Sequence, residues 1–337
     1  MLTKRHFAGL AGAVAAAVLA TAPAAGAVST PFVYSGTVRA DGPDRYATAA
    51  LVSRGSFAPS PGSTVFLASG ESFADALAAG PAAAHLDGPL LLTAAGGLPA
   101  ATRAELARLA PASVHVVGGS DRVPEAVVDA VRALLPSATV DRTAGADRYA
   151  TAVAVAQRFF PTGQVSFVLA RGDAFPDAVT GAALAGWRGE PLLLTAPERL
   201  PEAVTTWLSA AERTRATVVG GPESVSATVA ARTDLFLTAP QAVTRLSGAD
   251  RYATSAAVAR AAHPRSTVAV VATGRTFPDA LAAVPVAAVN GAPLLLVPGN
   301  CSPAATGDYL AGNGALRGVL VAGDSSAVAD GALERAC

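Results

Sequence analysis

One stretch of this chain occurs three times, and it constrains the fold more than any other feature. The shared pattern is Arg-x-x-Gly-x-Asp-Arg-Tyr-Ala-Thr-Ala/Ser, and its copies begin at Arg39, Arg142 and Arg245, 103 residues apart each time. A fixed period marks repeated structural units. Because about 100 residues is the length of an ordinary domain, we expect three related domains rather than the short repeats of a solenoid.

Within each repeat the same order of elements recurs. The motif Asp precedes an Ala/Val-rich segment, as expected for a helix N-cap. A short apolar run follows, and Gly-x-x-Phe-x-Asp-Ala then opens a helix of small residues. The unit is completed by Pro-Leu-Leu-Leu, a helix that begins at a proline, another apolar run, a Gly turn and a last helix. The residue after Pro-Leu-Leu-Leu is Thr in the first two copies and Val in the third. Short apolar strands that alternate with helices predict α/β units with buried parallel sheets, and without low-complexity linkers we expect the units to pack together.

The first residues have the features of a secretory signal peptide. Lys4 and Arg5 precede an apolar run from 7 to 20, and Ala25-Gly26-Ala27 forms an A-x-A cleavage site. We therefore expect a signal peptide at 1–27, followed by repeats at 28–137, 138–240 and 241–337. The end of the chain is too short and polar to span a bilayer, so no membrane insertion is expected after cleavage.

Charge and cysteine content exclude several classes of function. Removal of residues 1–27 leaves 23 arginines against 25 acidic residues. Such a near-neutral balance gives no support for nucleic-acid binding, which needs a basic surface. Cys301 and Cys337 are the only cysteines. In an exported protein such a pair predicts a disulfide, and two cysteines alone are too few ligands for a metal site.

The recurring polar residues are candidates for a binding site. In open α/β sheets ligands sit at the carboxyl ends of the strands, where the Gly-x-x-Phe-x-Asp and Gly-Gly turns lie. Arginine donates several hydrogen bonds to anions and sugars, and tyrosine offers a face for stacking. The structural alternative is that the motif Asp caps a helix while the motif Arg pairs with the turn carboxylate. The candidates are Arg39, Arg45, Tyr46, Asp75, Arg142, Arg148, Tyr149, Asp177, Arg245, Arg251, Tyr252 and Asp279.

Catalytic residues are not expected. His85, His115 and His263 do not recur at equivalent positions, and no nucleophile or zinc-hydrolase motif is present in the sequence. No cofactor is expected either. A catalytic centre rarely needs three copies in one chain, whereas a binder of a repetitive polymer gains affinity from linked sites.

The ordered motifs resemble the type 2 cell-wall-binding repeat of Gram-positive bacteria. The resemblance rests on the Arg-x-x-Gly-x-Asp-Arg-Tyr stretch, Phe-Pro-Asp-Ala-Leu-like turns, Pro-Leu-Leu-Leu and Val-Val-Gly-Gly, and it covers residues 36–337. It implies Rossmann/Toprim-like modules packed as a compact pseudo-threefold trimer. It also implies non-covalent attachment to anionic secondary wall polymers, such as teichoic-acid-like glycans. The family associates the Pro-Leu-Leu-Leu segment with polymer binding, although its apolar residues indicate a buried strand.

The third repeat departs from this pattern. Ala322 replaces a glycine of the Gly-Gly turn, and the helix after Pro303 is interrupted by glycine. The sequence therefore predicts a secreted, wall-associated binding protein that is not an enzyme and needs no oligomer. Two alternatives stay open: an extracellular small-ligand-binding protein, and an amidase-like wall hydrolase.

Overall fold

Three parallel four-stranded sheets form the framework of the protein in a computed structural model, which describes residues 36–160, 163–239 and 241–337. The predicted signal peptide lies outside the described residues. The first repeat contributes β1 (Gly36–Ala40), α1 (Arg45–Ser56), β2 (Thr64–Ser69), α2 (Phe73–His85), β3 (Leu90–Thr93), α3 (Ala100–Leu109), β4 (Ser113–Val117) and α4 (Glu125–Leu134). Strands and helices alternate, as the sequence predicts.

The second and third repeats follow the same order. The second contains β5 (Thr139–Thr143), α5 (Arg148–Phe159), β6 (Ser166–Arg171), α6 (Phe175–Arg188), β7 (Leu192–Thr195), α7 (Glu202–Ser209), β8 (Arg215–Val219) and α8 (Ala227–Asp234). The third contains β9 (Val243–Leu246), α9 (Arg251–Ala262), β10 (Val268–Thr273), α10 (Pro278–Val289), β11 (Leu294–Val297), α11 (Ala304–Gly312), β12 (Gly318–Ala322) and the 3-10 turn η1 (Ala332–Glu334). The Pro-Leu-Leu-Leu segments form β3, β7 and β11, and all of these strand residues are buried.

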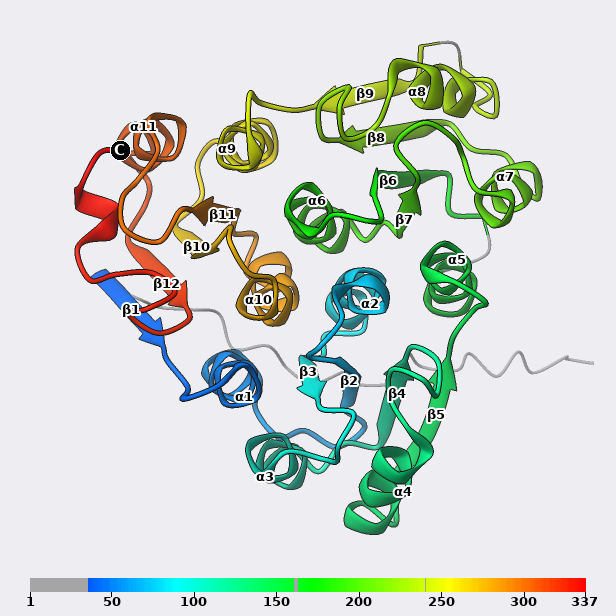
Figure 1. Ribbon diagram of the computed structural model, residues 1–337, viewed down its shortest axis with the longest axis vertical. Helices are drawn as coiled ribbons and strands as arrows, with labels where there is room; N and C mark the ends of the chain where they lie inside the picture. Colours follow the sequence, from blue (N-terminus) through cyan, green and yellow to red (C-terminus); the bar gives the residue numbers. More distant parts are fainter. Residues whose placement is uncertain (1–35, 161–162, 240) are drawn as a thin grey trace, which may run out of the picture.

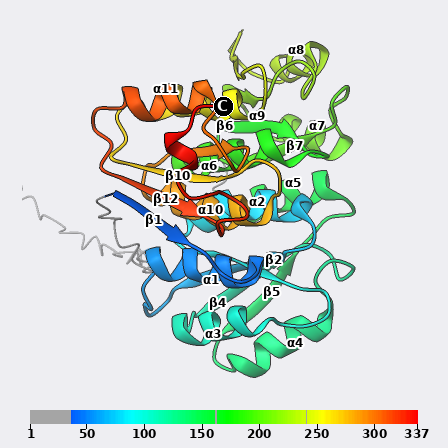
Figure 2. The ribbon, with the colours of Figure 1, turned by 60° about the vertical axis from the view of Figure 1, so that its left-hand side comes forward.

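Each sheet combines strands from two successive repeats. The strand orders are β3-β2-β4-β5, β7-β6-β8-β9 and β11-β10-β12-β1, all parallel. The strand that carries the first motif arginine therefore joins the sheet of the preceding repeat. For the first repeat this sheet belongs to the third one, with Gly36 opposite Gly318 and Ala40 opposite Ala322. Figures 1 and 2 show β1 beside β12, which closes the three modules into a ring.

The three helices of small residues meet in the middle of this ring, where Figure 1 shows α2, α6 and α10 around a pseudo-threefold axis. Small side chains permit the close approach: a Cβ on Gly80 would lie 2.6 Å from Val284, and one on Gly186 would lie 2.9 Å from Ala288. One cluster of buried apolar side chains runs through all three modules. The modules are therefore packed domains of one body.

The third module differs from the others at its end. The sequence predicted a last helix in every repeat, but after β12 the described chain forms only the short turn η1. The glycine-interrupted segment after Pro303 nevertheless forms helix α11. Among the described residues, no helix combines the length and apolarity required to cross a membrane.

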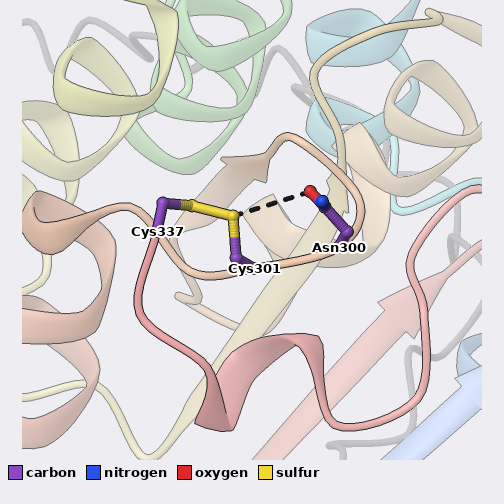
Figure 3. Close-up of a disulfide and its surroundings, with 3 residues drawn as sticks. All are labelled: Asn300, Cys301 and Cys337. Carbon is purple, nitrogen blue, oxygen red and sulfur yellow. Dashed lines mark hydrogen bonds between the residues drawn. A yellow bond between two sulfur atoms is a disulfide. The ribbon is translucent and has the colours of Figure 1, made fainter.

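The C-terminal tail is held beside the start of α11. The sulfurs of Cys301 and Cys337 lie 2.15 Å apart in disulfide geometry, with Cα atoms 5.2 Å apart (Figure 3). The backbone N–H of Ser302 donates to the carbonyl of Arg335, and that of Cys337 donates to the carbonyl of Ser302. These bonds fasten the tail to the segment that leads into α11.

Candidate functional site

Three equivalent pockets lie at the junctions between modules, at the carboxyl ends of the strands. We name them after the motif arginine that lines each: the Arg45, Arg148 and Arg251 pockets, with cavity volumes of about 280, 240 and 340 Å³. Each is walled by the motif loop of one repeat and by the first turn of the central helix of the preceding repeat. The turn after the last strand of that preceding repeat (β4, β8 or β12) completes the wall. This location is the one expected for ligands of open parallel sheets.

The motif loop is shaped by its own side chains. The Asp44 carboxylate accepts hydrogen bonds from the backbone N–H groups of Tyr46 and Ala47, so it caps α1 as predicted. The Gly42 N–H donates to the Thr48 hydroxyl, and a Cβ on Gly42 would lie 2.3 Å from the Thr48 nitrogen. The second repeat forms the same bonds through Gly145, Asp147 and Thr151. In the third repeat Gly248 bonds to Thr254 in the same way, and Asp250 accepts from the Ala253 N–H.

The motif arginine connects neighbouring modules. Arg45 donates to the Gly70 carbonyl at 2.6 Å, and its guanidinium lies 6.0 Å from the ring centre of Phe277 in the third module. Arg148 bonds to Gly172 over Phe73, and Arg251 bonds to Gly274 over Phe175. The predicted ion pairs with Asp75, Asp177 and Asp279 are wrong, because within the described chain these arginines bond to glycine carbonyls instead. Carbonyl bonds and cation–π contacts fix the arginines at the rim of the pockets.

The motif tyrosine explains the glycine that follows the next strand of its own repeat, β2, β6 or β10. A Cβ on Gly70, Gly172 or Gly274 would lie 2.6, 2.8 or 2.7 Å from the ring of Tyr46, Tyr149 or Tyr252. Any larger residue would displace the ring. Burial raises the pKa of Tyr46 and of Tyr149, so both phenols stay protonated at neutral pH. The tyrosines thus brace the site, and their predicted role as polymer contacts stays a hypothesis.

Asp75, Asp177 and Asp279 lie in the first turns of the central helices, and none of them is the capping residue of its helix. Each carboxylate packs against the first turn after a strand, at Gly118, Gly220 and Gly323. These glycines have φ of +117°, +115° and +111°, and a Cβ there would lie 2.9, 2.7 and 2.7 Å from the carboxylate oxygen. Only glycine fits both the backbone and the space.

The three carboxylates have different electrostatic surroundings. Burial raises the pKa of Asp279 to about 6; Asp324 adds to this shift and Arg45 opposes it. Burial also raises the pKa of Asp75, while a hydrogen bond from Thr151 opposes the shift. Asp177 accepts a hydrogen bond of 2.5 Å from the Ser224 hydroxyl. Of Asp75 and Asp279, whose pKa values are both raised, Asp279 in the Arg45 pocket has the larger shift and is the harder to ionise.

The outer motif arginines hold the glycine turns. Arg142 donates to the carbonyls of Gly118 and Val123 and pairs with Glu125 at 2.7 Å. Arg39 bonds to Gly323 and Asp330 in the same way, and Arg245 bonds to Gly220. In the structure Arg39, Arg142 and Arg245 brace the wall of the pocket, and their role as polymer contacts stays a prediction.

Sequence comparison between repeats missed a second set of charged residues. Arg122, Arg171 and Arg275 line the three pockets from positions that are not equivalent. Of the added carboxylates, Asp121 and Glu223 both lie three residues after the turn glycine, whereas Asp324 follows its glycine directly. Each pocket is nevertheless lined by two arginines and three carboxylates. A charge count over the loops at the strand ends, rather than a search for identical positions, would have found them. Among the described residues, no group of three or more His, Cys, Asp or Glu side chains could hold a metal ion.

Comparison with known proteins identifies the repeats. The family model described as "Cell wall binding domain 2 (CWB2)" matches residues 39–128, 142–230 and 245–333. The chain is 30% identical over 272 residues to "N-acetylmuramoyl-L-alanine amidase LytC" of Bacillus subtilis (strain 168), across 81% of this chain and 52% of that protein. It is 33% identical over 159 residues to the "Amidase enhancer" of the same organism, across 47% of this chain and 22% of that protein. It thus spans about half the length of the first of these relatives, and less of the second.

Solved structures share the fold. "Cwp6 from Clostridium difficile" superimposes with a TM-score of 0.79 at 26% identity, across 89% of this chain and 47% of that one. "Cwp8 from Clostridium difficile" gives 0.78 at 25% identity, across 86% and 50%. Both resemblances extend over nearly the whole described ring. Together with the threefold match of the family model, they show that this chain belongs to the cell wall binding domain 2 family.

Proposed function

We propose that this protein is secreted and attaches non-covalently to anionic secondary polymers of the cell wall, through the three pockets between its modules. The observation that carries the proposal is the threefold recurrence of the same pocket in a chain of this family. A polymer repeats its chemical unit, so three linked pockets raise its retention far above that of one. Each pocket combines guanidinium donors with carboxylate acceptors, which suits a sugar-containing chain.

We further propose that the protein has no catalytic activity of its own. The ionisable side chains in the pockets are aspartate, glutamate and arginine, and the motif residues among them have bracing or capping contacts. The competing function is wall hydrolysis, since one relative is named an amidase and the other an amidase enhancer. The chain matches the amidase over half its length, so this activity is tested directly by release of soluble fragments from purified peptidoglycan.

Retention on purified walls tests the proposal. Full-length protein is mixed with walls before and after extraction of their anionic polymers, and the bound fraction is measured after sedimentation. We expect binding to intact walls and its loss after extraction. Equal binding to extracted walls would contradict the proposal.

A pair of matched triple variants locates the site. Arg122→Ala, Arg171→Ala and Arg275→Ala together remove one arginine from each pocket without touching the bracing motif arginines. The control combines Arg103→Ala, Arg232→Ala and Arg317→Ala, which are exposed and lie outside the pockets. Both variants lose the same charge, so only the pocket variant should lose retention.

A further inference from the structure

The three pockets differ in the hydrogen bond that the carboxylate of the central helix accepts, and this difference indicates what the ligand supplies. In the Arg251 pocket the Ser224 hydroxyl donates to Asp177. In the Arg148 pocket the Thr151 hydroxyl bonds to Asp75. In the Arg45 pocket the residue equivalent to Ser224 is Ala327: each follows the turn glycine by four positions. Within the described chain, no residue donates a hydrogen bond to Asp279.

The other carboxylates of the Arg45 pocket have partners. Asp44 caps α1, and Asp324 accepts from the backbone N–H groups of Ser326 and Ala327 and from the Ser326 hydroxyl. Asp279 is half-buried against Gly323, and its pKa is raised to about 6 by this burial. A carboxylate withdrawn from water without a donor is unfavourable, and a ligand that donates a hydrogen bond removes this penalty.

The donors of this pocket are also incompletely used. One terminal nitrogen of Arg45 donates to the Gly70 carbonyl, and one terminal nitrogen of Arg275 donates to the Ser326 carbonyl. Guanidinium groups only donate and carboxylates only accept. Both arginines and Asp279 line the same cavity of about 280 Å³. A group that fits between them must therefore donate on one side and accept on the other.

Hydroxyl groups meet this requirement, whereas phosphate and ammonium groups do not. A phosphate oxygen would accept from Arg45 but would place negative charge beside Asp279 and Asp324, in a pocket whose carboxylates outnumber its arginines. An ammonium group would satisfy Asp279 and be repelled by both arginines. Two neighbouring hydroxyls of a sugar or polyol can donate to the carboxylate and accept from the guanidinium.

We propose that the Arg45 pocket binds a sugar or polyol unit of the wall polymer through two neighbouring hydroxyls, one donating to Asp279 and the other accepting from Arg45. The ligand hydroxyl takes the place that Ser224 fills in the Arg251 pocket. This inference rests on the proposed function and adds that the bound group is the sugar or polyol and not the phosphate.

A pair of hydroxyl exchanges tests this inference. Ala327→Ser supplies a protein hydroxyl to Asp279, so it should weaken wall retention about tenfold, which corresponds to roughly 1.4 kcal/mol or one hydrogen bond to a charged group. Ala261→Ser is the matched control, because it adds the same hydroxyl at an exposed position of the third repeat outside the pockets and should not weaken retention. Melting temperatures establish that both variants are folded. Asp279→Ala should weaken retention in the same way as Ala327→Ser, and a smaller effect of Asp279→Ala than of Asp177→Ala would overturn the inference.

Competition with small probes identifies the bound group. We expect repeat units whose phosphodiester bonds have been hydrolysed and phosphates removed to displace wild-type protein from walls, and inorganic phosphate to have no effect at equal ionic strength. Displacement by phosphate alone, or full retention of Ala327→Ser, would overturn the inference while wall binding itself stands. Binding of the phosphate-free repeat in solution without retention on walls would support the inference and refute the proposed function. If the protein neither binds the phosphate-free repeat in solution nor is retained on walls, the inference and the proposed function are both refuted.

Discussion

Replacement of Asp279 by asparagine should stabilise the protein at neutral pH. The carboxylate is half-buried in the wall of the Arg45 pocket, and its pKa rises from 3.8 to about 6. Because the folded state binds this proton more tightly than the unfolded state, stability is greatest below about pH 4 and falls as pH rises to about 6. Asparagine keeps the shape of the side chain and removes the charge that causes the loss.

The shift sets the size of the effect. A difference of about 2 pKa units corresponds to an upper limit of about 3 kcal/mol at pH 7, and the partly exposed position reduces it to about 1–2 kcal/mol. For a chain of this size each kcal/mol raises the melting temperature by about 2–4 °C. Asp324 opposes ionisation of Asp279 and Arg45 favours it, while Arg275 lines the same pocket, so these three residues stay unchanged in the experiment.

Calorimetric melting of the wild type and of the Asp279→Asn variant between pH 4 and pH 8 measures this difference in stability. The two curves should coincide near pH 4 and separate above pH 6, with the variant more stable. Asp177→Asn is the matched control, because Asp177 accepts a hydrogen bond from Ser224 and loss of its charge should not stabilise the fold. A variant that melts below wild type at pH 7 would refute the reasoning.

Three further changes test the framework around the pockets. Gly323→Ala should lower the free energy of unfolding by about 1–3 kcal/mol, because Gly323 has a φ of +111° and the new Cβ would lie 2.7 Å from the Asp279 carboxylate. Gly221→Ala is the control: its new Cβ would have no atom within 4 Å, so its melting temperature should hardly change. Truncation before Asp41 removes β1 and leaves β12 as an open edge; we expect a lower melting temperature and self-association in size-exclusion chromatography, and an unchanged monomer would contradict the closing role of β1. Cys301→Ser with Cys337→Ser should cost about 3–4 kcal/mol in the chain-entropy model, while intact mass of secreted wild type showing two free thiols would remove the basis of this prediction.

Much of this protein could be predicted from the chain alone, because local patterns repeat three times. The 103-residue period, the capping Asp44 and the apolar runs predict three α/β units, and these features act within a few residues of each other. The helices of small residues predict close packing, which the central position of α2, α6 and α10 confirms. Local sequence also marks Asp75, Asp177 and Asp279 as residues of the strand-end turns.

The partners of these residues depend on contacts across long sequence separations. The chain does not reveal that β1 completes the sheet of the third repeat, where Ala40 lies opposite Ala322 near the other end of the sequence. Parallel pairing leaves no local sequence signal of which strand will be the neighbour. Nor does it reveal that Arg45 lies over Phe277 and donates to the Gly70 carbonyl. A guanidinium can donate to many different acceptors, and only the packing of the folded chain selects one. The second charges of the pockets come from non-equivalent positions such as Arg122 and Arg275, which only the folded loops bring to the same place. Sequence therefore determined the modules, and tertiary structure decided the pockets, because each pocket forms only where two repeats meet.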